Sequence, residues 1–274
     1  IMEEGNEIVE RIKANKNLPI LTSCCPGWIN FIEHNYPDLL HIPSSCKSPH
    51  EMMGSILKHF WAEKVGVKAE DLFVVSVMPC SSKKYEAERE QLKTRGLKDV
   101  DAVLTTRELG RLIKRSGINF TKLPDEEFDM DLVGEYTGAG VIFGATGGVM
   151  EAALRTVYEI LEEKPLDNLD FEAVRGTDGI KEASVKMGGL DVNVAIVHGL
   201  GNARKLLDSI KAGEKNYHFI QVMACPGGCI NGGGQPIQVS NVRNWVDVKE
   251  KRAQVLYQGD REKFIRKSHN NPAI

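Results

Sequence analysis

Five of the six cysteines of this chain lie in three short segments that are far apart in the sequence, at residues 22–28, 78–80 and 223–236. Each segment begins where a run of apolar and β-branched residues predicts the end of a strand. In open α/β sheets, ligands bind at the carboxyl ends of the strands. The sequence therefore favours a fold in which three remote segments converge on one site.

Strand-like and helix-like patterns alternate along the whole chain. Alternation of this kind predicts an α/β fold with mostly parallel sheets flanked by helices. The run 72–78 is almost entirely apolar, which predicts a strand covered on both faces. The predicted strands are residues 19–22, 72–78, 100–105, 180–186, 192–198 and 218–223, and the predicted helices are residues 1–14, 26–34, 50–64, 107–115, 149–162 and 202–212. The fourth and fifth strands resemble a hairpin.

The 274 residues are enough for two modest domains. We expect an N-terminal lobe of residues 1–120 with the first two cysteine segments, and a C-terminal lobe of residues 121–274 with the third. A metal-cluster site is expected in the cleft between the lobes. Because the chain begins inside a helical pattern, we also expect it to be a fragment of a larger domain, truncated at both ends.

Composition excludes several classes of function. The net charge of −3 indicates no nucleic-acid partner. No apolar run approaches the roughly 18 residues that a membrane span needs. Six cysteines are too few for a disulfide scaffold in a chain of this length, and a bridge between the adjacent Cys24 and Cys25 would be strained. We expect reduced thiols and a cytoplasmic location.

The cysteine spacing is compatible with a metal site. Cys25, Cys80, Cys225 and Cys229 could supply four thiolates to an iron–sulfur cluster. The spacing differs from the compact array of a ferredoxin and from the two close pairs of a zinc ribbon. The alternative is that these cysteines are small buried hydrophobic residues. The glycine-rich run beside Cys229 favours a ligand, because glycine lets the backbone approach closely.

The three segments resemble the signature motifs of the catalytic domain of iron–iron (FeFe) hydrogenases. The matching stretches are TSCCPGW at residues 22–28, MPCSSKKYE at 78–86 and MACPGGCINGGGQP at 223–236, with further matches at 47–49 and 143–153. The resemblance covers nearly the whole chain and keeps the order of the family's motifs.

The resemblance implies a cofactor with two parts. The same four cysteines would hold a 4Fe–4S cubane, and Cys229 would bridge it to a diiron subcluster that carries CO, cyanide and an azadithiolate. Lys83 would neutralise and hydrogen-bond a cyanide, and Glu86 would pair with Lys83. The other residues implied to surround the cofactor are Met78, Phe143, Gly144, Met223, Gly232, Gly233 and Pro236. On spacing alone, Lys83 would be a surface residue and the methionines ordinary core residues.

The resemblance also implies a proton path. Cys24, the thiol that does not bind the cubane, would exchange protons with the azadithiolate amine. The path would continue through Glu4, Ser44 and Glu7 to Arg11. Without the resemblance, the helical spacing of these charged residues would indicate an exposed, salt-bridged helix face.

The function implied is that of an FeFe hydrogenase, which reversibly reduces protons to dihydrogen. Implied partners are maturation proteins and either ferredoxin or an electron-transfer subunit with accessory iron–sulfur clusters. Two alternatives remain open: a hydrogen sensor with the same fold, and a non-catalytic iron–sulfur carrier or assembly protein. Gln221 stands where many members of the family carry an acidic residue, and Cys46 has no implied role.

Overall fold

The computed structural model describes residues 1–126, 136–176 and 178–274. The α-helices are α1 (Met2–Ala14), α2 (Pro26–Asn35), α3 (Pro49–Ile56), α4 (Ala62–Lys64), α5 (Lys83–Ala87), α6 (Thr106–Arg115), α7 (Gly138–Val141), α8 (Gly148–Glu162), α9 (Leu200–Lys211), α10 (Ser240–Arg243) and α11 (Val248–Glu262). The strands are β1 (Ile20–Thr22), β2 (Val75–Met78), β3 (Ala102–Thr105), β4 (Ile180–Met187), β5 (Leu190–His198) and β6 (Phe219–Met223). A π-helical turn, Leu57–Trp61, joins α3 to α4 where the sequence predicts one continuous helix. In the ranges described, no helix is both long and apolar enough to cross a membrane.

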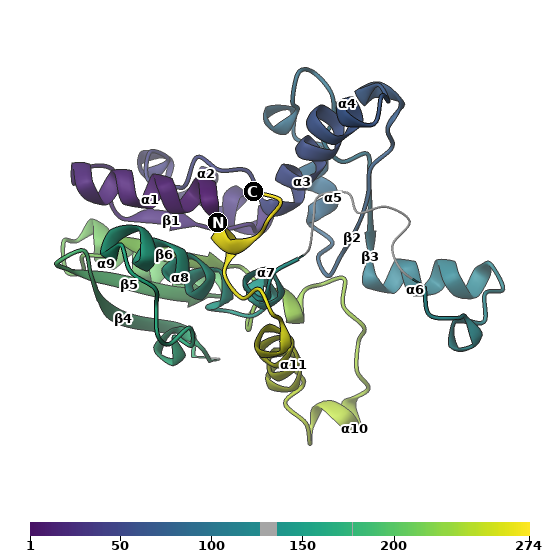
Figure 1. The fold of residues 1–274 in the computed structure, drawn as a ribbon. Coiled ribbons are helices and arrows are strands. Elements are labelled where there is room, and N and C mark those ends of the chain that lie inside the picture. Colours follow the sequence, from purple (N-terminus) through teal and green to yellow (C-terminus); the bar gives the residue numbers. More distant parts are fainter. Residues whose placement is uncertain (127–135, 177) are drawn as a thin grey trace.

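A four-stranded sheet with the strand order β1-β6-β5-β4 forms the larger body of the fold. β1 and β5 each pair in parallel with β6, whereas β4 pairs antiparallel with β5 as the predicted hairpin. A second sheet consists of the parallel pair β2–β3. Figure 1 shows the two bodies side by side, with β2 and β3 next to α3, α5 and α6. The predicted α/β fold with mostly parallel sheets is confirmed.

Helices cover both faces of the four-stranded sheet. On one face, Ile8 of α1 and Leu154 of α8 share a hydrophobic core with Phe219 of β6. On the other face, Trp28 of α2 shares a core with Ile220, which follows Phe219 in β6. Successive side chains of a strand point to opposite faces, so both faces of β6 are covered and the strand is buried along its whole length, with Gln221 as its one polar residue.

Among the described residues, helices cover one face of the two-stranded sheet. Val103 of β3 packs with Ala87 of α5 on the covered face. Phe73, just before β2, and Val77, within it, are 70% and 46% exposed. The prediction that the run 72–78 is buried on both faces is therefore wrong. In the described ranges, β2 is packed against helices on one face alone.

The cysteine segments follow the strands as predicted. Each of β1, β2 and β6 ends two residues before a cysteine. β1 and β6 are parallel neighbours, with Thr22 opposite Gln221, so the first and third segments leave the same edge of the sheet. This pairing crosses the boundary expected near residue 120. The division into two lobes there stays a prediction, and residues 127–135 lie outside the described ranges.

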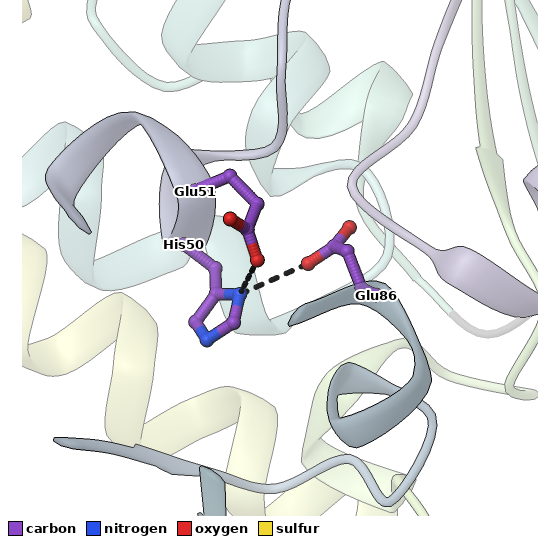
Figure 2. A group of neighbouring side chains, drawn as sticks. All are labelled: His50, Glu51 and Glu86. Carbon is purple, nitrogen blue, oxygen red and sulfur yellow. Dashed lines mark hydrogen bonds and ion pairs between the residues drawn. The ribbon is translucent and has the colours of Figure 1, made fainter. Parts of the chain in front are cut away.

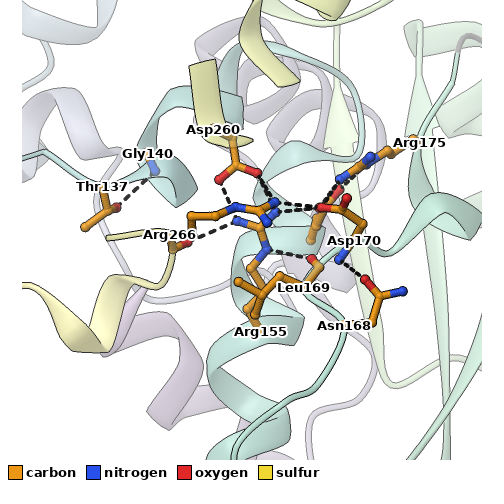
Figure 3. Close-up of polar contacts among 10 residues, drawn as sticks. Thr137, Gly140, Arg155, Asn168, Leu169, Asp170, Arg175, Asp260 and Arg266 are labelled. Atoms are coloured by element: carbon orange, nitrogen blue, oxygen red, sulfur yellow. Dashed lines mark hydrogen bonds and ion pairs between the residues drawn. The ribbon is translucent and has the colours of Figure 1, made fainter. Parts of the chain in front are cut away.

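Buried ion pairs join α11 and the residues after it to the rest of the fold (Figure 3). Arg155 of α8 donates hydrogen bonds to the two carboxylate oxygens of Asp260 at 2.9 and 2.8 Å. Arg266 donates to Asp260 and to Asp170, both at 2.6 Å. Arg155 and Asp260 have no exposed surface. Buried charges persist in a fold when they are paired in this way.

Candidate metal centre

Four partly buried thiols gather where β1, β2 and β6 end: those of Cys25, Cys80, Cys225 and Cys229. Burial raises the pKa of Cys225, and the neighbouring Cys25 and Cys80 raise it further. Cys229 also interacts electrostatically with Cys25 and Cys80. Such mutual effects require thiols that are close in space. Sulfur donors are soft ligands, which fit an iron–sulfur cluster better than a hard cation such as Mg²⁺.

A fifth thiol, Cys24, lies beside this group. The thiol of Cys229 donates a hydrogen bond to Cys24, which lowers the pKa of Cys24 to about 7 although burial opposes the change. Cys24 also lines a cavity of about 40 Å³ together with Glu4 and Phe143. A cavity of that size has room for a few water molecules or a small ligand. The structure thus places one thiol between the sulfur group and a cavity.

The glycine-rich run packs against the second cysteine segment. The backbone N–H of Gly234 donates to the carbonyl of Pro79 at 2.9 Å. A Cβ added to Gly232 would lie 2.3 Å from the same carbonyl oxygen, so only glycine permits this approach. These contacts bring the segment of Cys229 against that of Cys80.

Lys83 connects the second cysteine segment to the first. Its side chain is 6% exposed, and its Nζ donates to the carbonyl oxygen of Cys24 and to Glu86 Oε2, each at 2.6 Å. Ser48 also donates to Glu86 at 3.0 Å. Burial alone would raise the pKa of Glu86, but the hydrogen bond with His50 and the charge of Lys83 hold this pKa below its usual range. The ion pair expected between Lys83 and Glu86 is therefore present, and its role toward a cofactor stays a prediction.

The other residues expected around the cofactor lie in different surroundings. Phe143 lines the cavity. Met223 is buried, and its sulfur would lie 2.9 Å from a Cβ added to Gly228. Met78 packs against the small core of the two-stranded sheet. Gly144 faces Leu256 of α11.

Gly232, Gly233 and Pro236 belong to the glycine-rich run and do not line this cavity. They line a surface pocket with Arg107 and Arg252. Arg107 donates to the carbonyl of Gly233 at 2.6 Å, and Arg252 to that of Pro236 at 3.2 Å. These contacts hold the run from its outer side.

The residues of the expected proton path lie on α1 and beyond β1. Arg11 Nη2 donates to Glu7 Oε1 at 2.5 Å, and Ser44 Oγ donates to Glu7 Oε2 at 3.1 Å. Glu4 accepts a hydrogen bond from Thr22 Oγ1 at 2.7 Å and lines the cavity of the fifth thiol. The structure therefore joins the three outer residues directly and places the inner glutamate at the cavity.

Sequence reasoning missed four polar residues of this region. Thr22 and Ser45 bind the two glutamates of the expected path, Ser45 through its hydroxyl and its backbone N–H. His50 and Glu51 are buried beside Glu86 (Figure 2). Their adjacency to recognised motifs was a signal: Thr22 opens the first motif, and the other pair directly follows residues 47–49.

Two departures from the family pattern have defined surroundings. Cys46 lines the same cavity as Cys24, and burial raises the pKa of its thiol. Gln221 is buried, and its Oε1 accepts a hydrogen bond from the backbone N–H of Met150 at 2.8 Å. A carboxylate at that position could accept the same bond.

Residues 1–233 match the family described as "Iron only hydrogenase large subunit, C-terminal domain", and residues 246–274 match "Iron hydrogenase small subunit". The whole chain is 53% identical to part of the NADP-reducing hydrogenase subunit HndD of Solidesulfovibrio fructosivorans, covering 47% of that protein. It is 49% identical to iron hydrogenase 1 of Clostridium pasteurianum, again over its full length and 48% of the relative. The chain thus spans about half the length of these curated relatives.

A solved structure of a variant of the FeFe-hydrogenase HydA1 from Chlamydomonas reinhardtii superposes with a TM-score of 0.83 at 40% identity, covering 99% of this chain and 75% of that one. More distant relatives carry another name. Cytosolic iron-sulfur assembly component 3 of Mus musculus is 33% identical over 86% of this chain and 51% of its own length.

Proposed function

This chain belongs to the iron-only hydrogenase family, and we propose that it forms the catalytic part of an FeFe hydrogenase, which interconverts protons, electrons and dihydrogen. The chain spans only about half the length of its named relatives, so the activity of the whole protein is a proposal. The observation that carries the proposal is the gathering of four thiols from three strand ends, with a fifth thiol beside them at a cavity.

We propose Cys25, Cys80, Cys225 and Cys229 as the ligands of a 4Fe–4S cluster, with Cys229 shared with a diiron subcluster that carries CO, cyanide and an azadithiolate. When bound, this cofactor would supply the redox chemistry and the iron at which dihydrogen is made or split. Lys83 places a fixed positive charge at the site, because its ammonium group is held by Glu86 and by the carbonyl of Cys24. A positive charge there favours anionic ligands such as cyanide. The remaining side chains proposed to surround the cofactor are Met78, Phe143, Gly144, Met223, Gly232, Gly233 and Pro236.

Cys24 is proposed to move protons between the cavity and the cofactor. A thiol can give and take a proton, and its surroundings set its pKa over a range of several units. Glu4 lines the same cavity and can pass the proton on. Ser44, Glu7 and Arg11 then form the outer part of the path, in steps of hydrogen-bond length where Arg11 meets Glu7 and Glu7 meets Ser44.

The partners follow from the same chemistry. We propose that ferredoxin, or a subunit or domain with accessory iron–sulfur clusters, delivers the electrons, and that maturation proteins install the diiron subcluster. Residues 246–274, which match the small subunit of the family, are already joined to the large-subunit part through Arg155 and Asp260. We also propose a reducing, cytoplasmic location, because all six cysteines are unpaired. One relative, from Nitratidesulfovibrio vulgaris, is named a periplasmic Fe hydrogenase large subunit, so this point needs its own test.

A second candidate is a non-catalytic iron–sulfur assembly protein, which the 33% identical relatives favour. The identity to named hydrogenases is higher, at 53% and 49%. Infrared spectra separate the two, because metal-bound CO and cyanide absorb where proteins do not.

The test is to produce the chain together with hydrogenase maturation proteins and to record infrared spectra, iron content and dihydrogen evolution from reduced methyl viologen. The proposal predicts CO and cyanide bands and dihydrogen evolution. Iron–sulfur absorption without those bands and without dihydrogen would support the assembly candidate. A hydrogen sensor of the same fold would show the bands with slow turnover.

A further inference from the structure

Lys83 belongs to a buried cluster of four charged or titratable side chains. His50 and Glu51 come from the first turn of α3, and Glu86 and Lys83 come from α5. All four are less than 8% exposed. Figure 2 shows both carboxylates approaching Nδ1 of the His50 ring, which lies 3.1 Å from Glu51 Oε1 and 3.0 Å from Glu86 Oε2.

A positive charge on His50 would balance the charges of this cluster. Of its two buried carboxylates, Glu86 pairs with the ammonium group of Lys83, and Glu51 lies beside His50. Removing an unpaired charge from water is costly, so the second carboxylate must either take up a proton or have a positive partner. A metal ion or a proton on the imidazole could supply that positive charge.

The geometry points to the proton. Lys83 Nζ already lies 2.6 Å from Glu86 Oε2, where a metal ion would repel it. A divalent ion would also leave the cluster with an excess positive charge, whereas an imidazolium makes it neutral. His50 Nδ1 lies 3.1 Å from Glu51 Oε1, a buried oxygen that accepts no well-aligned hydrogen bond from the described residues. A positive charge on the ring would attract this carboxylate at that distance.

The second ring nitrogen is also bonded. His50 Nε2 lies 2.7 Å from Ser76 Oγ of β2, so that the hydroxyl can accept a hydrogen bond from the ring. Burial alone would lower the pKa of His50, but its hydrogen bonds with Glu51 and Glu86 raise it above the ordinary value. Lys83 opposes this rise, and the hydroxyl of Ser76 at Nε2 is uncharged.

We propose that His50, as an imidazolium ion, is a positioning residue that holds Glu86 and thereby orients Lys83 toward Cys24. The connection runs from Ser76 in β2 to His50 in α3. It continues through Glu86 and Lys83 in α5 to the carbonyl of Cys24, which follows β1. With a neutral His50, Glu51 and Glu86 would compete for the one ammonium group. Lys83 would then be drawn from the carbonyl of Cys24. The consequence for catalysis rests on the proposed function, since it assumes that Lys83 faces the cofactor.

The first test needs neither a variant nor a cofactor. The chain is labelled with ¹⁵N-histidine, and long-range ¹H–¹⁵N correlation spectra of the cofactor-free protein are recorded between pH 6 and pH 9. His50 is expected to show two protonated ring nitrogens at pH 7.5, where an unperturbed histidine is mostly neutral. A neutral ring at pH 7.5 would overturn the proposal whether or not the protein is a hydrogenase.

The second test compares His50→Gln with His59→Gln. His59 is half-buried and lies in the π-helical turn after α3, where its Nε2 is 3.9 Å from Asp99 Oδ1. In ¹⁵N-lysine spectra of the cofactor-free chain, the ammonium signal of Lys83 should exchange slowly in the unaltered protein and in His59→Gln, and quickly in His50→Gln. In the loaded enzyme, His50→Gln should lower the rate of dihydrogen evolution about tenfold, as changes behind a ligand-orienting group do.

The outcomes separate the positioning role of His50 from the proposed function of the protein. If Lys83 behaves identically in both variants, the positioning role is wrong even where dihydrogen is made. If the two ammonium signals differ as expected but no form of the protein makes dihydrogen, the positioning role stands and the proposed function fails.

Discussion

The ammonium nitrogen of Lys83 lies 2.6 Å from the main-chain carbonyl oxygen of Cys24, to which it donates a hydrogen bond. This bond joins the helix after the second cysteine segment to the loop of the first. It fixes a positive charge next to Cys24, whose thiol we propose to be free of iron.

Replacing Lys83 should destabilise the fold even without a cofactor. Lys83→Gln leaves Glu86 without its ammonium partner in a buried site, and loss of one partner of a buried ion pair costs roughly 3–5 kcal/mol. The matched control is Lys84→Gln, since Lys84 pairs with Glu108 at the surface and such pairs contribute little. Urea unfolding of the cofactor-free chain measures both. Equal stability of the two variants would contradict the structural role given to Lys83.

Removing the free thiol should stop turnover without removing iron. In Cys24→Ala the proton path loses its inner member, and we expect dihydrogen evolution to fall by a factor of about 10² to 10⁴. Iron content and the infrared bands should be unchanged. Cys46→Ala is the control, because Cys46 lines the same cavity and has no place in the path. If Cys24→Ala evolves dihydrogen at the original rate, the relay assigned to it is wrong.

Glu7 should matter for rate and not for cofactor binding. Its carboxylate joins Arg11 to Ser44, and Glu7→Gln keeps the shape of the side chain while removing its acid–base function. We expect a rate loss of about tenfold or more, with a normal infrared spectrum. Glu10→Gln, an exposed change on the same helix, should have no effect. A normal rate for Glu7→Gln would mean that protons take another route.

The network around Asp260 should make the fold sensitive to acid. Burial alone would raise the pKa of Asp260, but hydrogen bonds from Arg155 and Arg266 hold this pKa below its usual range. A carboxylate with a lowered pKa stabilises the fold above its unfolded pKa of about 3.9, and this stabilisation is lost as the pH falls further. Asp260→Asn should therefore lower the free energy of unfolding at pH 7 and flatten its fall below about pH 4. An unaltered pH profile would show that this carboxylate is not the acid-sensitive group.

Close packing of the glycine-rich run should be necessary for cofactor binding. Gly232→Ala would place a methyl group 2.3 Å from the carbonyl oxygen of Pro79 and push the segment of Cys229 away from that of Cys80. We expect less iron bound per chain. Gly201→Ala, where a methyl group meets nothing within 4 Å, should bind iron normally. Equal iron content in both variants would mean that this contact does not hold the site together.

Local patterns in the sequence were enough to predict the sheet that positions the site. β1, β5 and β6 are apolar runs bounded by breaks, and their parallel pairing follows from the alternation with helices. The two-stranded sheet misled the same reasoning, since an apolar run indicates a strand but not how many of its faces are covered. Phe73 and Val77 look like core residues in the sequence and are exposed in the described structure.

Other parts depend on contacts that no local pattern contains. α11 is rich in charged residues and was not predicted, because what ties it to the fold is the contact of Asp260 with Arg155, far away in the sequence. The site was predicted in outline from its motifs. The charged cluster was not, because His50 and Glu51 acquire their meaning only when α5 brings Glu86 beside them.

The measurement that tests the central claim most directly is cluster reconstitution with iron and sulfide, followed by iron analysis and electron paramagnetic resonance of the reduced protein. Single alanine variants of all six cysteines would be compared. The account predicts that replacing Cys25, Cys80, Cys225 or Cys229 lowers the content of 4Fe–4S cluster, and that Cys24→Ala and Cys46→Ala keep it. A full cluster in the first four variants, or an equal loss in all six, would contradict it.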